Sequence, residues 1–505
     1  MNKILKDQKL AELIIKFKKE KKITALLHGV FDVLHIGHIK YFEDIKRYCD
    51  VIIVSVTDDP FVNKGPGRPL FNIEERMKMI SSIESVNFVT ISRSETAEKI
   101  IKTIKPDLFV KGKDYKNKKN DLSKNINKEI KAIKSVGGKF LTTESPLHSS
   151  SKIINEETNI LSEDLKKFLK IIDKEKIRKN YFSLLENINN KKILIIGEPI
   201  IDVYNYVKIQ GKSSKNNILS SKHISTDEFG GGTFLVANTI AEYGSNIDFL
   251  TFYNQYNKKY IKKFLSNKNI NLKLIKDNKI KFLIKKRFID QYSNNRLYQI
   301  NYNDETSLNK EAGRKINNYL KKNHKKYDYI VAFDFGHNYF SAEVVNILNK
   351  LHKKTFINCQ SNSSNFGYNL INKYKKALTI AMDEQEFRLS VQDKNTDVKN
   401  LIKSNRKLIN KFKNFVITMG KFGCYHSSNG LVNFIPAVYS TFKDTTGSGD
   451  VFFSIYISLK ITNKFSDNEA CLISHLAAGL HANYIGNEKK FNKKTLYKAL
   501  DLILK

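Results

Sequence analysis

The sequence contains no run of 18 or more apolar residues, so we expect no helix that spans a bilayer. Its first 22 residues carry apolar side chains at helical spacing, but they lack the apolar core and the small-residue cleavage site of a signal peptide. The four cysteines, Cys49, Cys359, Cys424 and Cys471, form no closely spaced pair, which argues against a zinc site and a disulfide framework. Together these absences predict a cytoplasmic protein.

Arginine is scarce, although the chain is strongly basic, with a formal net charge of +36. Nucleic-acid binding requires basic residues clustered on one face or along one stripe. Here lysine, asparagine and isoleucine are abundant along the whole chain, which indicates a uniform compositional bias and argues against nucleic acid as a partner. The positive field would still attract anionic substrates such as nucleotides and sugar phosphates.

Two segments begin with an apolar run and continue into a glycine-containing turn: ITALLHGVFDVLHIGH (23–38) and KKILIIGEPIIDVY (191–204). A strand that ends in a glycine turn and leads into a helix is typical of nucleotide-binding α/β domains. A chain of 505 residues has room for two of them. The sequence therefore predicts an N-terminal helix (1–21), a first α/β domain (22–155), a helical linker (156–190) and a second α/β domain (191–505).

Apolar runs predict the strands of both domains. In the first domain they cover 51–59, 86–92 and 107–112, with an amphipathic helix over 73–86 and a Lys/Asn-rich loop over 114–130. In the second domain the predicted strands are IDFLTFY (247–253), YIVAFDFG (329–336), KTFINCQ (354–360), ALTIAMDE (377–384) and FVITMG (415–420).

The first candidate site is the stretch GVFDVLHIGH, in which His35 and His38 flank Gly37 directly after a strand. Three positions apart on the first turn of a helix, both imidazoles face the same way, and the helix N-terminus beside them binds anions. Two such histidines can stabilise the charge that develops as pyrophosphate leaves. No protein nucleophile is needed, because the incoming phosphate oxygen attacks the α-phosphorus directly.

GVFDVLHIGHIKYF resembles the signature of the cytidylyltransferase-like nucleotidyltransferases, which have a Rossmann-like HxGH domain. The resemblance continues through TDDPFVNKGPGRPLFNIEERMKMISSIESVNFV and KPDLFVKGKDY. These segments are similar to the nucleotidyltransferase domain of the bifunctional heptose kinase/adenylyltransferases of lipopolysaccharide synthesis. The similarity covers about residues 22–155.

The resemblance implies roles for individual residues of the first domain. His35 and His38 would bind the triphosphate of ATP or CTP, with Mg²⁺ bridging its phosphates. Lys64 occupies the place of a catalytic phosphate-binding lysine, and HSSSKII (148–154) resembles a late turn that holds the β- and γ-phosphates, with Asn155 near the position of its closing basic residue. The other implied nucleotide-binding residues are Gly29, Phe31, Gly37, Arg76, Ser150 and Ser151.

HIGH-type motifs also occur in class I aminoacyl-tRNA synthetases, and KMISS (78–82) is similar to their second lysine loop. That segment lies inside an amphipathic helical pattern and soon after the first motif, so we interpret the similarity as a coincidence.

The second candidate site is KDTTGSGDVFFSIYISLK, where Gly447, Ser448 and Gly449 precede an apolar helix. Backbone N–H groups at such a helix start can hold γ-phosphoryl oxygens. Asp450, expected to be the first residue of the helix, is placed to accept a proton from an attacking hydroxyl. The alternative is a plain turn with Asp450 as a helix cap.

This motif resembles the C-terminal signature of the PfkB/ribokinase family of carbohydrate kinases, over about residues 191–505. The resemblance implies a ribokinase-like fold, ATP as phosphoryl donor and Mg²⁺ held by MDEQE (382–386), where Asp383 replaces the family's asparagine and Glu386 is retained. EFGGGTFLVANTIAEYG (228–244) resembles the family's sugar-binding motif. The remaining implied residues are Thr418, Gly420 and Gly423 for the nucleotide, and Asp202, Gly231 and Gly232 for the sugar.

Several features depart from the heptose enzymes. Leu235 stands where they have a sugar-binding asparagine, which changes the hydroxyls that the pocket can satisfy. The lid segment 212–223 is unlike theirs, and the transferase precedes the kinase. Lys285 and Arg287 could supply cations to a phosphorylated substrate or simply be exposed at a strand end.

The sequence therefore predicts a bifunctional enzyme that phosphorylates a sugar or sugar phosphate and transfers AMP or CMP to a sugar phosphate. Its partners are small-molecule sugars and nucleotides, no membrane is expected, and a homodimer is a possible assembly. Two alternatives stay open: an active transferase with an inactive kinase-like sensing or scaffold domain, and an RNA-binding, synthetase-like protein.

Overall fold

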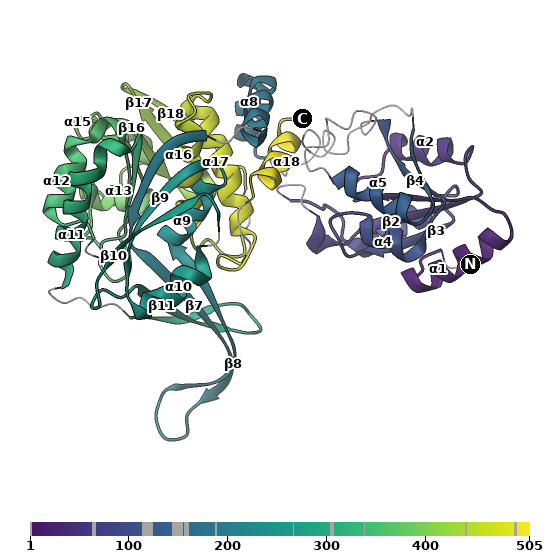
Figure 1. Cartoon of the computed structure of the whole chain (residues 1–505), viewed down its shortest axis with the longest axis horizontal. Coiled ribbons are helices and arrows are strands. Elements are labelled where there is room, and N and C mark those ends of the chain that lie inside the picture. Colours follow the sequence, from purple (N-terminus) through teal and green to yellow (C-terminus); the bar gives the residue numbers. More distant parts are fainter. Residues whose placement is uncertain are drawn as a thin grey trace. The chain divides into compact units, whose positions relative to one another are not determined.

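The computed structural model describes residues 3–62, 67–113, 125–143, 155, 161–186, 189–265, 267–302, 308–337, 339–439, 442–488 and 492–505. The chain forms two units (Figure 1). The first unit contains Met1–Leu161 and Tyr497–Lys505, and the second contains Ser162–Leu496.

A parallel five-stranded sheet of order β3-β2-β1-β4-β5 lies at the centre of the first unit. The order reverses between β1 and β4, and ligands of open α/β sheets bind at the carboxyl ends of the strands beside such a reversal. Its strands are β1 (Thr24–Gly29), β2 (Val51–Thr57), β3 (Phe88–Ser92), β4 (Leu108–Lys111) and β5 (Lys139–Thr142). Its helices are α1 (Asp7–Lys19), α2 (Ile36–Ile45), α3 (Ile73–Ser81), α4 (Glu98–Ile104) and α5 (Asn125–Ser135).

Helices cover both faces of this sheet. Phe42 of α2 and Ile80 of α3 belong to one apolar cluster, whereas Ile14 of α1 and Ile101 of α4 belong to another. The three strands predicted from apolar runs are confirmed. The loop predicted over 114–130 is wrong from residue 125 onward, because α5 buries Ile126, Glu129 and Ile133 on one face.

The second unit is built on a nine-stranded sheet of order β10-β9-β6-β13-β14-β15-β16-β17-β18. The strands are parallel from β10 to β16, and the last two pair antiparallel. They are β6 (Asn189–Gly197), β9 (Gly244–Tyr253), β10 (Ile270–Lys276), β13 (Tyr329–Asp334), β14 (Thr355–Cys359), β15 (Ala377–Asp383), β16 (Phe412–Thr418), β17 (Cys424–Ser428) and β18 (Leu431–Ile435). All five strands predicted for this domain are present.

The helices of the second unit include α16, whose residues from Asp450 to Leu459 are all buried. This burial explains why its sequence is apolar all round. The helices are α7 (Glu163–Ile171), α8 (Lys174–Glu186), α9 (Thr233–Ala241), α10 (Gln255–Phe264), α11 (Leu308–Asn323), α12 (Ala342–Lys350), α13 (Glu384–Val391), α14 (Val398–Ser404), α15 (Arg406–Ile409), α16 (Ser448–Lys460) and α17 (Asp467–Ala482). The last helix, α18 (Lys493–Ile503), begins in the second unit and ends in the first.

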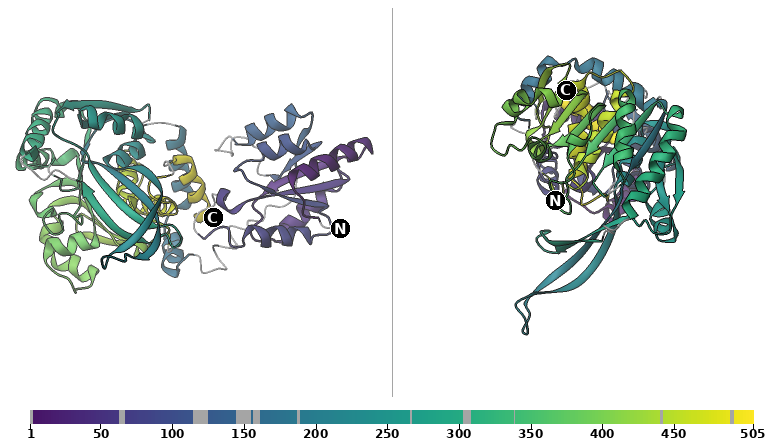
Figure 2. Two further views of the ribbon diagram at one scale, coloured as in Figure 1. Left: turned by 90° about the horizontal axis from the view of Figure 1, so that it is seen from below. Right: turned by 90° about the vertical axis from the view of Figure 1, so that its left-hand side faces the viewer.

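A second, four-stranded sheet of order β12-β11-β7-β8 completes this unit. The hairpin of β7 and β8 extends beyond the rest of the unit (Figures 1 and 2). The strands are β7 (Pro199–Lys212), β8 (Leu219–Gly232), β11 (Leu283–Asp290) and β12 (Arg296–Tyr302). Asp202 of β7 pairs in register with Lys285 of β11, and Tyr204 pairs with Arg287, so these side chains share one face.

None of the described helices is long and apolar enough to cross a bilayer.

Candidate active sites

The two histidines of the first unit lie together where β1 leads into α2. His35 is the N-cap of α2, and its Nδ1 accepts the N–H of Gly37 at 3.1 Å. His38 Nδ1 accepts the N–H of His35 at 3.4 Å, and the two rings stack with centroids 4.0 Å apart. Because each Nδ1 accepts a backbone hydrogen, a neutral ring carries its proton on Nε2 and can donate it to a phosphate oxygen.

The turn before these histidines is held tightly. Phe31 has a φ of 49°, and its ring lies 5.5 Å from that of His38. A Cβ on Gly29 would lie 3.1 Å from the Phe31 ring. Arg76 is fully buried, where it donates to Val30 O at 2.6 Å and to Phe71 O at 2.9 Å and pairs with Asp59. In this structure Arg76 therefore stabilises the turn through its hydrogen bond to Val30 O.

The predicted phosphate-binding residues Lys64, Ser150 and Ser151 lie outside the described residues. Asn155 is described: its Oδ1 accepts from Arg68 at 2.8 Å and its Nδ2 donates to Leu502 O at 2.8 Å. Sequence reasoning missed Asp32, which is 2% exposed and accepts the N–H of Leu70 at 2.7 Å. The available signal was its position in the stretch GVFDVLHIGH, three residues before His35.

In the second unit, the sheet of β7 and β11 gathers the predicted substrate-binding residues. Asp202 forms a buried ion pair with Arg287. Gly231, at the end of β8, leaves space for this carboxylate, because a Cβ there would lie 2.1 Å from Asp202 Oδ2. Gly232 adopts a φ of 54°, which favours glycine. Lys285 is also buried, which lowers the pKa of its ammonium group, so the exposed-strand alternative for Lys285 and Arg287 is wrong.

A cavity of about 190 Å³ brings together most of the predicted phosphoryl-transfer residues. Asp450 is the third residue of α16 and not the first as predicted, because Gly447, with a φ of 75°, is the N-cap. Burial raises the pKa of Asp450 to about 7, against the opposing effects of Gln360 and Lys285. The cavity is lined by Asn358, Gln360, Ala381, Met382, Asp383, Glu386, Thr418, Gly447, Gly449, Asp450, Phe452 and Phe453. Ser448 is absent from this lining, and its hydroxyl is buried without a partner among the described residues.

The two candidate metal-binding carboxylates form the start of α13. Asp383 accepts the N–H of Glu386 at 2.7 Å, and Glu386 accepts the N–H groups of Asp383 at 2.8 Å and Ser361 at 2.9 Å. Burial and the neighbouring Asp383 raise the pKa of Glu386 to about 8. No group of three or more metal-ligating side chains occurs among the described residues.

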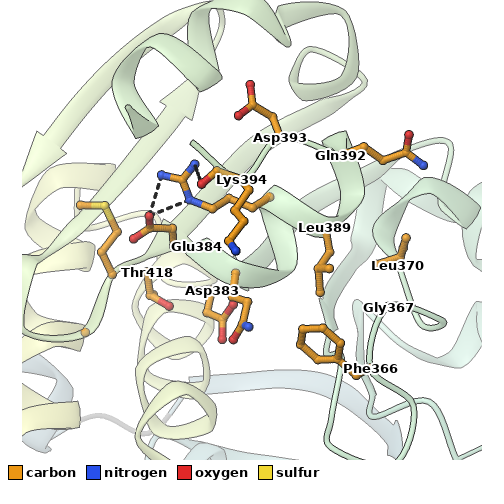
Figure 3. A pocket seen from close by; sticks show the side chains of 14 residues that line it. Phe366, Gly367, Leu370, Asp383, Glu384, Leu389, Gln392, Asp393, Lys394 and Thr418 are labelled. Atoms are coloured by element: carbon orange, nitrogen blue, oxygen red, sulfur yellow. Dashed lines mark hydrogen bonds and ion pairs between the residues drawn. The ribbon is translucent and has the colours of Figure 1, made fainter. Parts of the chain in front are cut away.

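The predicted nucleotide turn follows β16. Gly420 and Gly423 have φ values of 54° and 114°, and a Cβ on Gly423 would lie 2.3 Å from Ile435 O. Thr418 and Gly420 line a second cavity, of about 950 Å³, whose lining also includes Asp383 (Figure 3). The shared residues Asp383 and Thr418 make the two cavities neighbours. Gly423 shapes the turn but does not line either cavity.

Sequence reasoning missed two polar groups of the second unit, Asp444 and His337. Burial alone would raise the pKa of Asp444, but hydrogen bonds from Thr446, Tyr204 and Gly486 hold it at about 2. His337 follows β13, and burial together with the charge of Lys285 lowers its pKa to about 4. Asp444 belongs to the DTTGSGD motif, which was the available signal for it. For His337, the available signal was a polar residue shortly after a buried parallel strand.

Comparison with known proteins agrees with this geometry. The family model described as "pfkB family carbohydrate kinase" matches residues 190–490, well over half of the chain. The chain belongs to the pfkB family of carbohydrate kinases. The model described as "Cytidylyltransferase-like" matches residues 26–156. These matches confirm the predicted fold class, a Rossmann-like nucleotidyltransferase domain followed by a ribokinase-like kinase domain.

Curated relatives match the N-terminal part. The bifunctional protein HldE of Aliarcobacter butzleri is 39% identical over 138 residues, which are 25% of this chain and 29% of that protein. HldE of Nitratiruptor sp. is 40% identical over 141 residues, 27% of this chain and 30% of that protein. The match thus spans less than a third of these relatives. Among solved structures, Escherichia coli phosphofructokinase-2 in complex with potassium is 13% identical, with a TM-score of 0.49 over 62% of this chain and 99% of that chain.

Proposed function

We propose that this pfkB-family protein is a bifunctional enzyme. Its kinase domain transfers the γ-phosphate of ATP to a hydroxyl of a sugar or sugar phosphate. Its cytidylyltransferase-like domain transfers AMP or CMP to a sugar phosphate and releases pyrophosphate. The observation that carries the kinase half is the buried Asp450, which lies in a cavity with the Asp383–Glu386 pair and within electrostatic reach of Asp202 and Lys285.

Asp450 would act as the general base of the kinase. The acceptor hydroxyl gives its proton to the carboxylate as its oxygen bonds to the γ-phosphorus, and the bond from that phosphorus to the ADP oxygen breaks. The Gly447–Gly449 segment would receive the phosphoryl oxygens at the start of α16. Asp202 and Lys285 would orient the acceptor, with Arg287 fixing the Asp202 carboxylate.

Asp383 and Glu386 fit Mg²⁺, which prefers carboxylate and water oxygens. The pKa values of both carboxyls are raised, chiefly by desolvation, so a nearby cation would stabilise their ionised forms. Both oxygens of Glu386 already accept backbone hydrogens, which favours a bridging water over direct ligation. The ion would neutralise charge on the donor phosphates.

In the transferase half, an oxygen of the sugar phosphate would attack the α-phosphorus of ATP or CTP while the bond to pyrophosphate breaks. His35 and His38 would donate from Nε2 to the phosphate oxygens whose charge increases. The proposed contacts of Lys64, Ser150 and Ser151 depend on the family resemblance alone. The cytoplasmic location and the homodimer remain predictions.

The test is a pair of assays on the wild-type chain and on Asp450→Asn. One follows transfer of label from γ-labelled ATP to each member of a sugar and sugar-phosphate panel. The other follows pyrophosphate release with each nucleoside triphosphate against a panel of sugar 1-phosphates. We expect a substrate in each panel. Label transfer that is absent in the wild type, or that persists in Asp450→Asn, would contradict the kinase half and favour the scaffold alternative. Absent pyrophosphate release would contradict the transferase half.

A further inference from the structure

Gln360, which the sequence did not single out, contacts the proposed base directly. It follows β14 and lines the same cavity as Asp450. Its Nε2 donates to Asp450 Oδ1 at 2.6 Å, a short hydrogen bond between an amide and a carboxylate. The two residues are 90 positions apart in the chain.

The Gln360 side chain is held in this orientation by its own neighbours. Nε2 also donates to Asn358 Oδ1 at 2.7 Å, so both of its hydrogens have acceptors. Asn358 Nδ2 donates to Ala381 O at 3.0 Å, which fixes the Asn358 oxygen toward Gln360 and settles both amide orientations. The Gln360 backbone is anchored at both ends, by Asp334 O at 2.9 Å and by Asn369 Nδ2 at 2.9 Å.

We propose that Gln360 is a positioning residue of the kinase: it fixes the Asp450 carboxylate and favours its ionised form, so that the other carboxylate oxygen can accept the acceptor's proton. This inference rests on the proposed kinase function. It assigns Gln360 no hydrogen bond donated to the substrate, because its amide hydrogens are used by Asp450 and Asn358.

The charges around Asp450 show why such a donor is needed. Lys285 on β11 favours the ionised carboxylate, whereas Asp202 on β7 opposes it. Glu386 on α13 also interacts unfavourably with Asp450. Burial dominates and raises the pKa of Asp450 to about 7, and Gln360 is the largest of the groups that lower it. Without its hydrogen bond, the base would be protonated over more of the neutral range.

The test variant is Gln360→Met, which keeps an unbranched chain and removes the donor. Its matched control is Gln291→Met, at an exposed turn after β11. For the acceptor found in the wild type, we expect the rising limb of kcat/KM against pH to move up by about one to two pH units. At pH 6 the rate should fall about tenfold or more, while at pH 9 it should stay within about threefold of wild type. Gln291→Met should follow the wild-type profile.

A second measurement does not depend on activity. In protein labelled with ¹³C at the aspartate carboxyls, the Asp450 signal is the one lost in Asp450→Asn. Its titration midpoint should be higher in Gln360→Met than in the wild type. An Asp450 midpoint that is equal in Gln360→Met and in the wild type would overturn the inference, whether or not the protein is a kinase. A raised midpoint with an unshifted pH profile of kcat/KM would also overturn it. If the wild type transfers no phosphate, the kinase proposal fails, and the carbon titration alone decides whether Gln360 controls the carboxylate.

Discussion

Three buried carboxyl groups of the kinase domain show how residue surroundings set their chemistry. Asp444 accepts hydrogen bonds from Thr446, Tyr204 and Gly486 and stays ionised, with a pKa near 2. For Asp450 and Glu386, burial is the largest effect and raises the pKa to about 7 and about 8. Asp444 is therefore suited to stabilising the fold. Asp450 is suited to exchanging a proton, and Glu386 to interacting with a cation.

Asp444 should stabilise the fold in a pH-dependent way. Its folded pKa is lowered, so its contribution is present above the unfolded value near 3.8 and is lost as the pH falls through about 2. At pH 7, Asp444→Asn should therefore lower the free energy of unfolding by about 2 kcal/mol. Urea unfolding at pH 7, 4 and 2.5 checks this, and a wild-type-to-variant difference that does not shrink as the pH falls would contradict it.

Gly231 should be required for acceptor binding and not for the transferase. In Gly231→Ala the new methyl group would collide with Asp202 Oδ2, which must then move from its position beside Arg287. We expect kcat/KM for phosphoryl transfer to fall by roughly 10- to 100-fold. Pyrophosphate release should stay at the wild-type rate, and its loss in parallel would indicate a general folding defect instead.

At the scale of elements, β11 presents different chemistry on its two faces. Lys285 and Arg287 face inward beside Asp202 and Tyr204, whereas Lys286 lies between them on the other face and contacts the Tyr302 ring. The adjacent residues Lys285 and Lys286 thus have different surroundings, so a substitution of Lys286 is a matched control for the same substitution of Lys285.

Lys285→Met should weaken binding of the acceptor, raising its KM by about tenfold or more, because a charged donor is lost from a buried site. Lys286→Met should change KM by less than about twofold. Steady-state kinetics with the identified acceptor measure both. Equal effects of the two substitutions would show that Lys285 acts only through the overall charge.

Sequence pattern was sufficient for the predicted strands, which are apolar runs within parallel sheets. It did not predict β8, β10, β12, β17 or β18. It was insufficient for α5, where lysine and asparagine conceal the spacing of Ile126 and Ile133. The sugar-side face depends on strand pairing between Asp202 and Lys285, which the spacing of residues does not reveal. The bond from Gln360 to Asp450 joins positions far apart in the chain, so only the folded geometry could identify it.

At the scale of the whole molecule, the two predicted reactions belong to separate units. The histidine pair lies in the first unit, whereas Asp450 and Asp202 lie in the second. Each unit has its own sheet and its own apolar core. Loss of one catalytic group should therefore leave the other reaction intact.

The most direct test of the two-activity account measures both reactions in Asp450→Asn and in His38→Ala. We predict that Asp450→Asn loses at least about 100-fold of its label transfer from γ-labelled ATP and keeps wild-type pyrophosphate release. His38→Ala should show the reverse pattern, with pyrophosphate release reduced at least about 100-fold. Label transfer that survives in Asp450→Asn, or pyrophosphate release that survives in His38→Ala, would contradict the account.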